Sequence, residues 1–150
     1  MLTFSAPNFP PSIITPSSEP FMLTFIASPY QAKTPAGLVT NISYARAATR
    51  HALSLGEYPF TPHLLYTQEG ILQDAIPEER ALGLSAGKAW LRRAERLAVY
   101  KDFGISEGMR EEIALAHKIG LEIVFRYLPK AFYVPGLALT AISALDLPPC

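Results

Sequence analysis

The stretch that decides the fold reads LAVYKDFGISEGMREEIALAHKIG and covers residues 97–120. Its apolar start is typical of a buried strand, its middle is a loop rich in Gly and Ser, and its last part has the spacing of an amphipathic helix that ends near Gly120. Ser106 is a natural helix cap, and Gly108 lets a ligand approach the backbone. Because a helix N-terminus offers free N–H groups and a partial positive charge, this unit predicts a site for an anionic ligand.

Glu112 departs from the pattern of that helix. The apolar positions recur at helical spacing, and Glu112 flanks the face that they form. Glu111 turns toward the face of Lys118, so we expect it to be a solvated charge. Two interpretations of Glu112 are open. It is an ordinary carboxylate at the boundary of the apolar face, or it points into a pocket beside the anion site and acts as a nucleophile or base.

Composition limits the class of protein. The chain has 150 residues, 49% hydrophobic and 17% charged, with a formal net charge of zero. These values predict one globular domain and argue against the broad basic surface of a nucleic-acid-binding protein. The single cysteine, Cys150, forms no internal disulfide, and no Cys/His cluster suggests a metal site. We therefore expect no metal, no cofactor and no nucleic acid.

The chain start gives no sign of export. It lacks a basic segment and is soon broken by prolines, unlike a signal peptide, and no apolar run reaches the length of a membrane span. We expect a cytoplasmic protein without a membrane partner.

The predicted elements alternate along the chain. Residues 1–20 are a Pro-rich irregular arm, and residues 21–150 form the domain, with an apolar tail at 129–150 that could include a short helix over 137–145. The predicted strands are 21–27, 58–61, 97–100 and 121–125. The first predicted helix starts at Pro35, after a Thr34 cap, and stops at Gly56. The second covers residues 77–95, and the third ends near Gly120. Residues 62–76 are predicted to form a long loop.

This alternation predicts an α/β fold. We expect a single-domain, doubly wound parallel sheet of the flavodoxin or Rossmann-like kind, with four to five strands and helices on both faces. Ligands bind such sheets at the carboxyl ends of the strands, where the strand order reverses. With flavodoxin-like order that crevice lies between the first and third strands, and the loops that meet there are Ser28-Pro29-Tyr30 and 102–108.

Three segments resemble one family. They are FIASPY at 25–30, AWLRRAE at 89–95, and the pattern in which Ser106, Gly108, Met109, Glu112 and Ile113 fall at fixed spacing. Together they resemble the first-strand motif, the "WL-x-x-AD" segment and the Ser/Asp-x-Gly-x-x-x-Glu-Ile/Leu signature of the nucleoside 2-deoxyribosyltransferase superfamily. The resemblance extends from about residue 22 to 127 and is nearest to small phage-associated members.

The resemblance implies chemistry at the N-glycosidic bond of a nucleoside or nucleotide. The glutamate that matches Glu112 attacks the anomeric carbon, the base leaves, and water or another base completes hydrolysis or transfer. A serine at position 106, where transferases acting on free nucleosides carry Asp, implies a 5′-monophosphate ligand. Ser28, Pro29, Tyr30, His63, Ser106, Gly108 and Met109 are the expected substrate-binding residues. The resemblance also implies a homodimer or a larger homo-oligomer.

One departure from the family pattern leaves alternatives open. Gly87 occupies the position of an Asp that helps to bind or protonate the leaving base. Asp102 or His63 could supply that acid, and Tyr30 could stack on the base. Without an acid the protein could be a catalytically silent nucleotide binder. A third possibility is an interaction protein whose apolar tail docks on a partner.

Overall fold

The computed structural model describes residues 21–133; the predicted arm over residues 1–20 and the tail after residue 133 lie outside the described residues. The elements are β1 (Met22–Ala27), α1 (Pro35–Ser54), β2 (Glu57–Phe60), α2 (Pro62–Tyr66), α3 (Pro77–Leu91), β3 (Arg96–Tyr100), α4 (Glu107–Ile119), β4 (Glu122–Arg126) and a short 3₁₀ helix, η2 (Lys130–Phe132).

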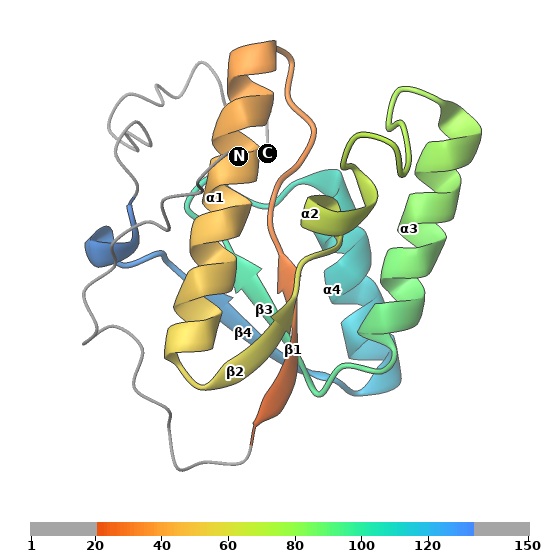
Figure 1. The fold of residues 1–150 in the computed structure, drawn as a ribbon. Coiled ribbons are helices and arrows are strands. Elements are labelled where there is room, and N and C mark those ends of the chain that lie inside the picture. Colours follow the sequence, from red (N-terminus) through yellow and green to blue (C-terminus); the bar gives the residue numbers. More distant parts are fainter. Residues whose placement is uncertain (1–20, 134–150) are drawn as a thin grey trace, which may run out of the picture.

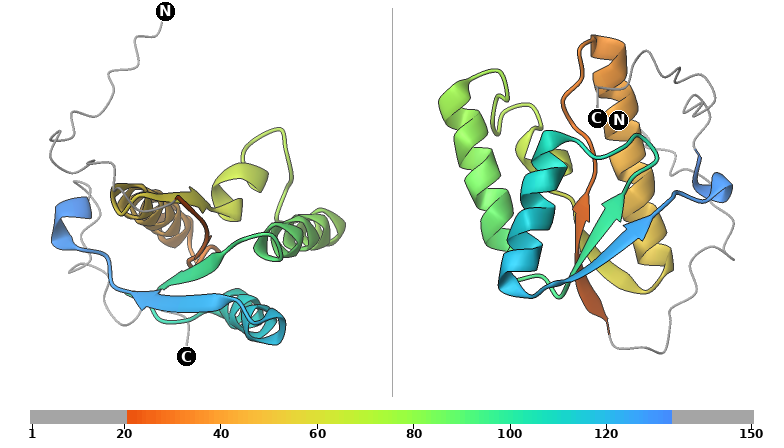
Figure 2. Two further views of the ribbon diagram at one scale, coloured as in Figure 1. Left: turned by 90° about the horizontal axis from the view of Figure 1, so that it is seen from below. Right: turned by 180° about the vertical axis from the view of Figure 1, so that it is seen from behind.

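The strands form one parallel sheet in the order β2-β1-β3-β4, as Figure 1 shows. This order reverses between β1 and β3, so the predicted fold class and the predicted switch point are both confirmed. Figure 2 shows α1 on one face of the sheet and α3 and α4 on the other. The carboxyl ends of β1 and β3 therefore open toward the loops that precede α1 and α4.

Alternate residues of the two central strands supply two cores. Ile26 and Tyr100 pack with α1, whereas Phe25 and Val99 pack with α3 and α4. All four side chains are essentially inaccessible to solvent. Burial on both faces explains why these strands read as continuous apolar runs in the sequence.

Two helices begin and end as predicted. Thr34 caps α1, because its Oγ1 accepts a hydrogen bond from the Gly37 N–H at 3.0 Å, and Gly56 follows the helix with φ of 80°. Ser106 caps α4 by accepting from the Met109 N–H at 3.3 Å, and Gly120 ends that helix with φ of 71°.

Two predicted boundaries were wrong. The predicted loop over 62–76 begins with the short helix α2, and α3 ends at Leu91 instead of near Glu95. The helix stops because Glu95 is drawn onto the sheet: its N–H donates to the Leu23 carbonyl at 2.8 Å, and its carboxylate accepts from the Leu23 N–H at 2.7 Å. Side-chain and backbone pairing to β1 thus outweighs one further helical turn.

Helix α2 is fixed to α3 by aromatic contacts. Trp90 of α3 stacks on Phe60 with ring centroids 4.8 Å apart, and its indole N–H donates to the Tyr66 hydroxyl at 2.8 Å. These contacts hold α2 against α3, where both helices contribute to the pocket described below.

A polar network lies on the α1 side of the sheet. The buried Glu57 carboxylate pairs with the guanidinium groups of Arg96 and Arg126. Arg126 also donates to the Tyr100 hydroxyl at 3.3 Å, and that hydroxyl lies 2.8 Å from Nδ1 of His51. The network joins β2, β3, β4 and α1 through charged and hydrogen-bonded groups.

Between residues 21 and 133, no helix combines the length and the apolar character that a membrane crossing requires.

Candidate functional site

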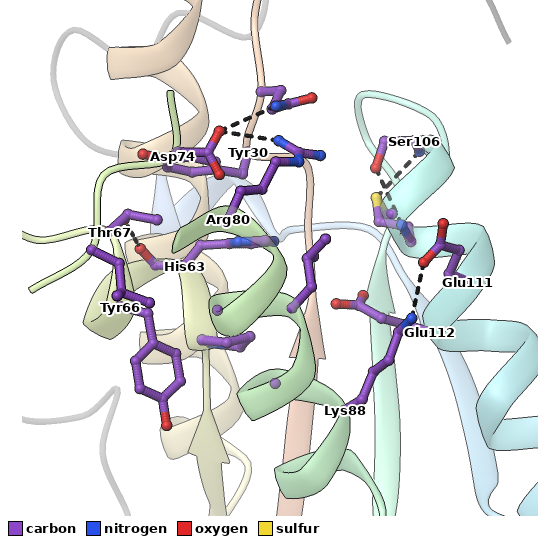
Figure 3. A pocket seen from close by; sticks show the side chains of 18 of the residues that line it. Tyr30, His63, Tyr66, Thr67, Asp74, Arg80, Lys88, Ser106, Glu111 and Glu112 are labelled. Carbon is purple, nitrogen blue, oxygen red and sulfur yellow. Dashed lines mark hydrogen bonds and ion pairs between the residues drawn. The ribbon is translucent and has the colours of Figure 1, made fainter. Parts of the chain in front are cut away.

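A cavity of about 390 Å³ opens beside the switch point of the sheet. Its walls come from the segment after β1, from α2 and the loop that follows it, from α3, and from the first turns of α4 (Figure 3). The loops after β1 and β3 both contribute, so the cavity lies where the strand order predicted a ligand site.

The structure brings most of the predicted site residues to this cavity. Those that line it are Tyr30, His63, Ser106, Gly108, Met109 and Glu112. Segments far apart in the sequence therefore meet at one site.

Ser28, Pro29 and Asp102 are not among the residues that line the cavity. Ser28 and Pro29 are buried at the end of β1, and the Ser28 hydroxyl has no hydrogen-bond partner among the described residues. Their predicted contact with a ligand stays a prediction.

Asp102 belongs to the α1 side of the sheet. Its carboxylate accepts hydrogen bonds from the Tyr44 hydroxyl and, at 3.0 Å, from the Leu128 N–H, and both partners are part of the core under α1. Asp102 thus ties α1 to the segment after β4. Asp102 does not line the cavity in this structure, so a role as the acid for a leaving base stays a prediction.

Glu112 points into the cavity from α4 (Figure 3). Its Oε2 is buried and has no hydrogen-bond partner within the described chain. Burial, reinforced by the neighbouring Glu111 charge and opposed by Lys88, raises the pKa of Glu112 to about 8. With this pKa the carboxyl group is mostly protonated at neutral pH. An unpaired, half-buried carboxyl group in a cavity favours the functional interpretation of Glu112 over the ordinary one.

Glu111 is exposed, as expected, but it does not turn away from the site. Its carboxylate pairs with the Lys88 ammonium group of α3 at 3.2 Å, and both residues line the cavity. The pair spans the gap between α3 and α4, next to Glu112 (Figure 3). Glu112 therefore lies beside a cation that is already engaged by another carboxylate.

These two neighbours should set the ionisation of Glu112 in opposite directions. Lys88→Met is expected to raise the pKa of Glu112 above about 8, because it removes the only cause that lowers it. Glu111→Gln is expected to lower that pKa, since it removes a like charge and releases Lys88. Titration of carboxyl carbons by NMR, with Glu112→Gln used to assign the resonance, measures both shifts. Equal Glu112 pKa values in the three proteins would contradict this account.

His63 and Tyr30 form a stacked aromatic pair in the wall of the cavity. Their ring centroids lie 5.1 Å apart with the planes 14° from parallel. Burial is the main cause that lowers the pKa of His63 to about 4. The ring is therefore neutral at physiological pH, and His63 holds no proton that an imidazolium acid would give to a leaving base.

Sequence reasoning missed a hydrogen-bonded group near Tyr30 and His63, on the side of the cavity away from Glu112 (Figure 3). The Asp74 carboxylate accepts from Gln31 Nε2 at 3.1 Å and pairs with Arg80 Nη1 at 3.1 Å. It connects the loop after β1, the loop after α2 and the first turns of α3 (Figure 3). The only signal in the sequence was the unusual length of the loop that carries Asp74.

The N-terminus of α4 forms another part of the wall. The Ser106 oxygen accepts from the Met109 N–H, so its own proton remains available to a ligand. A Cβ added at Gly108 would meet nothing within 4 Å, which shows open space beside the backbone here. Room for a ligand and free N–H groups of the first turn thus coincide.

Gly87 lies in the wall formed by α3. A Cβ at this position would lie 3.6 Å from Cβ of Pro62, an ordinary van der Waals contact. The absence of a side chain is therefore not forced by crowding, and it leaves space in the cavity.

Among the residues from 21 to 133, no group of three or more His, Cys, Asp or Glu side chains could hold a metal ion.

Comparison with known proteins assigns a family without a described activity. The chain belongs to the DUF7768 family, a domain of unknown function, which matches residues 22–126. No curated protein and no solved structure matches the chain. The matched region covers all four strands and the helices that line the cavity.

Proposed function

We propose that this protein cleaves, or transfers, the N-glycosidic bond of a (deoxy)nucleoside 5′-monophosphate, with Glu112 as the nucleophile. The observation that carries the proposal is the buried, unpartnered carboxyl oxygen of Glu112 in a cavity, one turn into a helix whose N-terminus borders the same cavity. The resemblance of the segments around residues 25–30, 89–95 and 106–113 to nucleoside 2-deoxyribosyltransferases supports the reaction class.

The reaction has two steps in this proposal. The ionised Glu112 oxygen attacks C1′ of the sugar, the C1′–N bond breaks, and its electron pair leaves with the base, which takes a proton from solvent. Water, or a second base, then attacks C1′ of the glycosyl ester, loses a proton to solvent and releases the carboxylate. Because only the ionised form is a nucleophile, the Lys88 ammonium group assists by favouring the carboxylate.

The parts of the ligand find complementary groups along the cavity. A 5′-phosphate suits the first turn of α4, where the Ser106 hydroxyl and open space beside Gly108 meet free backbone N–H groups. A planar base suits the wall formed by Tyr30 and His63. Glu112 lies on α4 below Ser106, across the cavity from Tyr30 and His63 (Figure 3).

The test is base release. Purified protein is incubated with each ribonucleoside and deoxyribonucleoside monophosphate, and free base is followed by chromatography, with Glu112→Ala in parallel. We expect release by the wild type alone, and a rate that increases with pH up to about 8, as Glu112 loses its proton. Release that decreases through this range would make Glu112 an acid instead of a nucleophile. Release that is equal in Glu112→Ala would refute its role.

A catalytically silent nucleotide-binding protein is the second candidate. It is favoured by Gly87, which adds no acid to the cavity wall, and by the neutral His63 ring. In that case the same nucleotides raise the melting temperature of the protein, but no base is released.

Two finer expectations remain part of the proposal. The resemblance favours a homodimer or a larger homo-oligomer, and light scattering of the purified protein measures its oligomeric state. We also propose that the protein acts in the cytoplasm, where its nucleotide ligands are found.

A further inference from the structure

The cavity is acidic. The acidic side chains that line it are those of Asp74, Glu79, Glu107, Glu111 and Glu112. The basic side chains that line it are those of Arg80 and Lys88. Five carboxyl groups against two cations give a formal charge of −3 when all are ionised. Low-dielectric walls strengthen the field of such a group of charges inside a cleft.

Both cations are already engaged by protein carboxylates. Arg80 pairs with Asp74, and Lys88 pairs with Glu111. Among the charged residues that line the cavity, the excess carboxyl groups are therefore those of Glu79, Glu107 and Glu112. A ligand that brings a positive charge gains from this excess, whereas a neutral ligand does not.

Glu112 points to the place where that charge is needed. Its buried Oε2 has no hydrogen-bond partner among residues 21–133, and the nearby Lys88 is paired with Glu111, so a carboxylate there has no cation of its own. A cation within a few ångströms would favour ionisation of Glu112 and so generate the nucleophile. The ligand would supply a positive charge beside Glu112, because Arg80 and Lys88 are paired with other carboxylates.

The aromatic wall is compatible with a flat cation. Tyr30 and the neutral ring of His63 stack in parallel at the edge of the cavity and add no positive charge of their own. Ring faces attract cations, and a planar cation can stack on such a wall.

We propose that the preferred substrates of this site are N-glycosides whose base carries a fixed positive charge, such as a pyridinium or an N7-alkylated purinium. This inference rests on the proposed function, since it names the class of base on which Glu112 acts. The 5′-phosphate of the proposed substrate keeps its place at the first turn of α4. The test compounds below omit that phosphate, so that the two members of each pair differ in the charge of the base.

The chemistry balances without a leaving-group acid. On binding of the cation, the Glu112 proton passes to solvent. The carboxylate then forms a bond to C1′ while the C1′–N bond breaks, and the electron pair of that bond neutralises the ring nitrogen. The base leaves as a neutral molecule without receiving a proton. Gly87 and the neutral His63 are therefore no obstacle for this class of substrate.

The test compares two compounds of nearly equal shape. Nicotinamide riboside is a pyridinium, and its 1,4-dihydro form is uncharged. Binding of each to Glu112→Gln, which should not turn them over, is measured by calorimetry at pH 7. We expect the pyridinium to bind at least about tenfold more tightly. The same preference is expected for N7-methylguanosine over guanosine. Equal or tighter binding of the uncharged members overturns the inference.

A matched pair of variants identifies the source of the preference. Glu111→Gln removes a cavity carboxylate and frees Lys88, so it should reduce the preference for the cation several-fold in the Glu112→Gln background. Glu78→Gln removes an exposed carboxylate of α3 that does not line the cavity, and it should leave the preference unchanged. Equal effects of the two variants would also overturn the inference.

Kinetics of the wild type separate this inference from the proposed function. For a cationic substrate, the pH profile of kcat should show a lower apparent pKa for Glu112 than the profile of kcat/KM. The reason is that kcat reports the complex, in which the bound cation favours the Glu112 carboxylate. If uncharged nucleotides are cleaved in a Glu112-dependent way with no preference for cationic bases, the proposed function holds and the inference fails. If the proposed function fails, no compound of either class loses its base, and then this inference fails with it.

Discussion

Glu112→Gln is expected to abolish base release and, at the same time, to stabilise the fold. Loss of the nucleophile should lower the rate by about a thousandfold or more, because an amide cannot form the glycosyl ester. The carboxyl group is also unfavourable for stability above pH 4.5, since burial raises its pKa to about 8 in the folded protein while the unfolded chain keeps the ordinary value.

The stability effect has a defined dependence on pH. Below about pH 4.5 the carboxyl group is protonated in both states, so wild type and variant should be equally stable. Between pH 4.5 and about 8 the unfolded chain loses the proton and the folded protein keeps it, which destabilises the wild type progressively. At pH 8 the variant should be more stable by on the order of 4 kcal/mol. Urea unfolding at pH 4.5 and pH 8 measures this difference.

Glu111→Gln is the control for this experiment. It removes the neighbouring, exposed carboxylate and its ion pair with Lys88, so its direct effect on stability should be within about 1 kcal/mol. A Glu112→Gln variant that is less stable than the wild type at pH 8 would show that Glu112 has a structural role instead.

Glu57→Gln is expected to cause the largest loss of stability. The variant leaves Arg126 and Arg96 on the α1 side without the buried carboxylate that pairs with both. Removal of one partner of a buried ion pair costs about 3–5 kcal/mol, because the remaining charge stays desolvated. The midpoint of urea unfolding should decrease accordingly, without a change in the slope of the transition.

Glu122→Gln is the matched control, since it removes the other carboxylate that pairs with Arg96. Glu122 is exposed, and its carboxylate lies 2.8 Å from Arg96 Nε. Solvent screening limits such a pair to about 0–1 kcal/mol. Equal losses for Glu57→Gln and Glu122→Gln would contradict the importance that we assign to burial.

The sequence was sufficient for the fold because local and long-range signals agreed. Apolar runs marked β1 and β3, and Thr34, Pro35, Ser106 and Gly120 marked helix ends. The end of α3 was not predictable in this way, because Glu95 is hydrogen-bonded to the backbone of Leu23 in β1, which is distant in the sequence. The helix α2 was hidden by its short length and by the Pro62 that begins it.

The site was predicted in part. The strand order and the helix pattern were enough to bring Tyr30, Ser106 and Glu112 to one cavity. The ion pairs of Asp74 with Arg80 and of Lys88 with Glu111 were not predictable, since each joins elements whose relative position depends on packing. The hydrogen bonds of Asp102 to Tyr44 and Leu128 were not predictable for the same reason, because nothing in its local sequence distinguishes the two faces of the sheet.

The central position of β1 has a consequence for synthesis of the protein on the ribosome. β1 leaves the ribosome first, yet it receives its second neighbour only when β3, which begins at Arg96, has been made. Until then the inner residues of β1, among them Phe25 and Ile26, have one strand partner and lack most of their cover. Parallel pairings between distant segments form slowly and expose nascent chains to aggregation. The nascent chain therefore passes through an interval in which the apolar residues of β1 are open to aggregation.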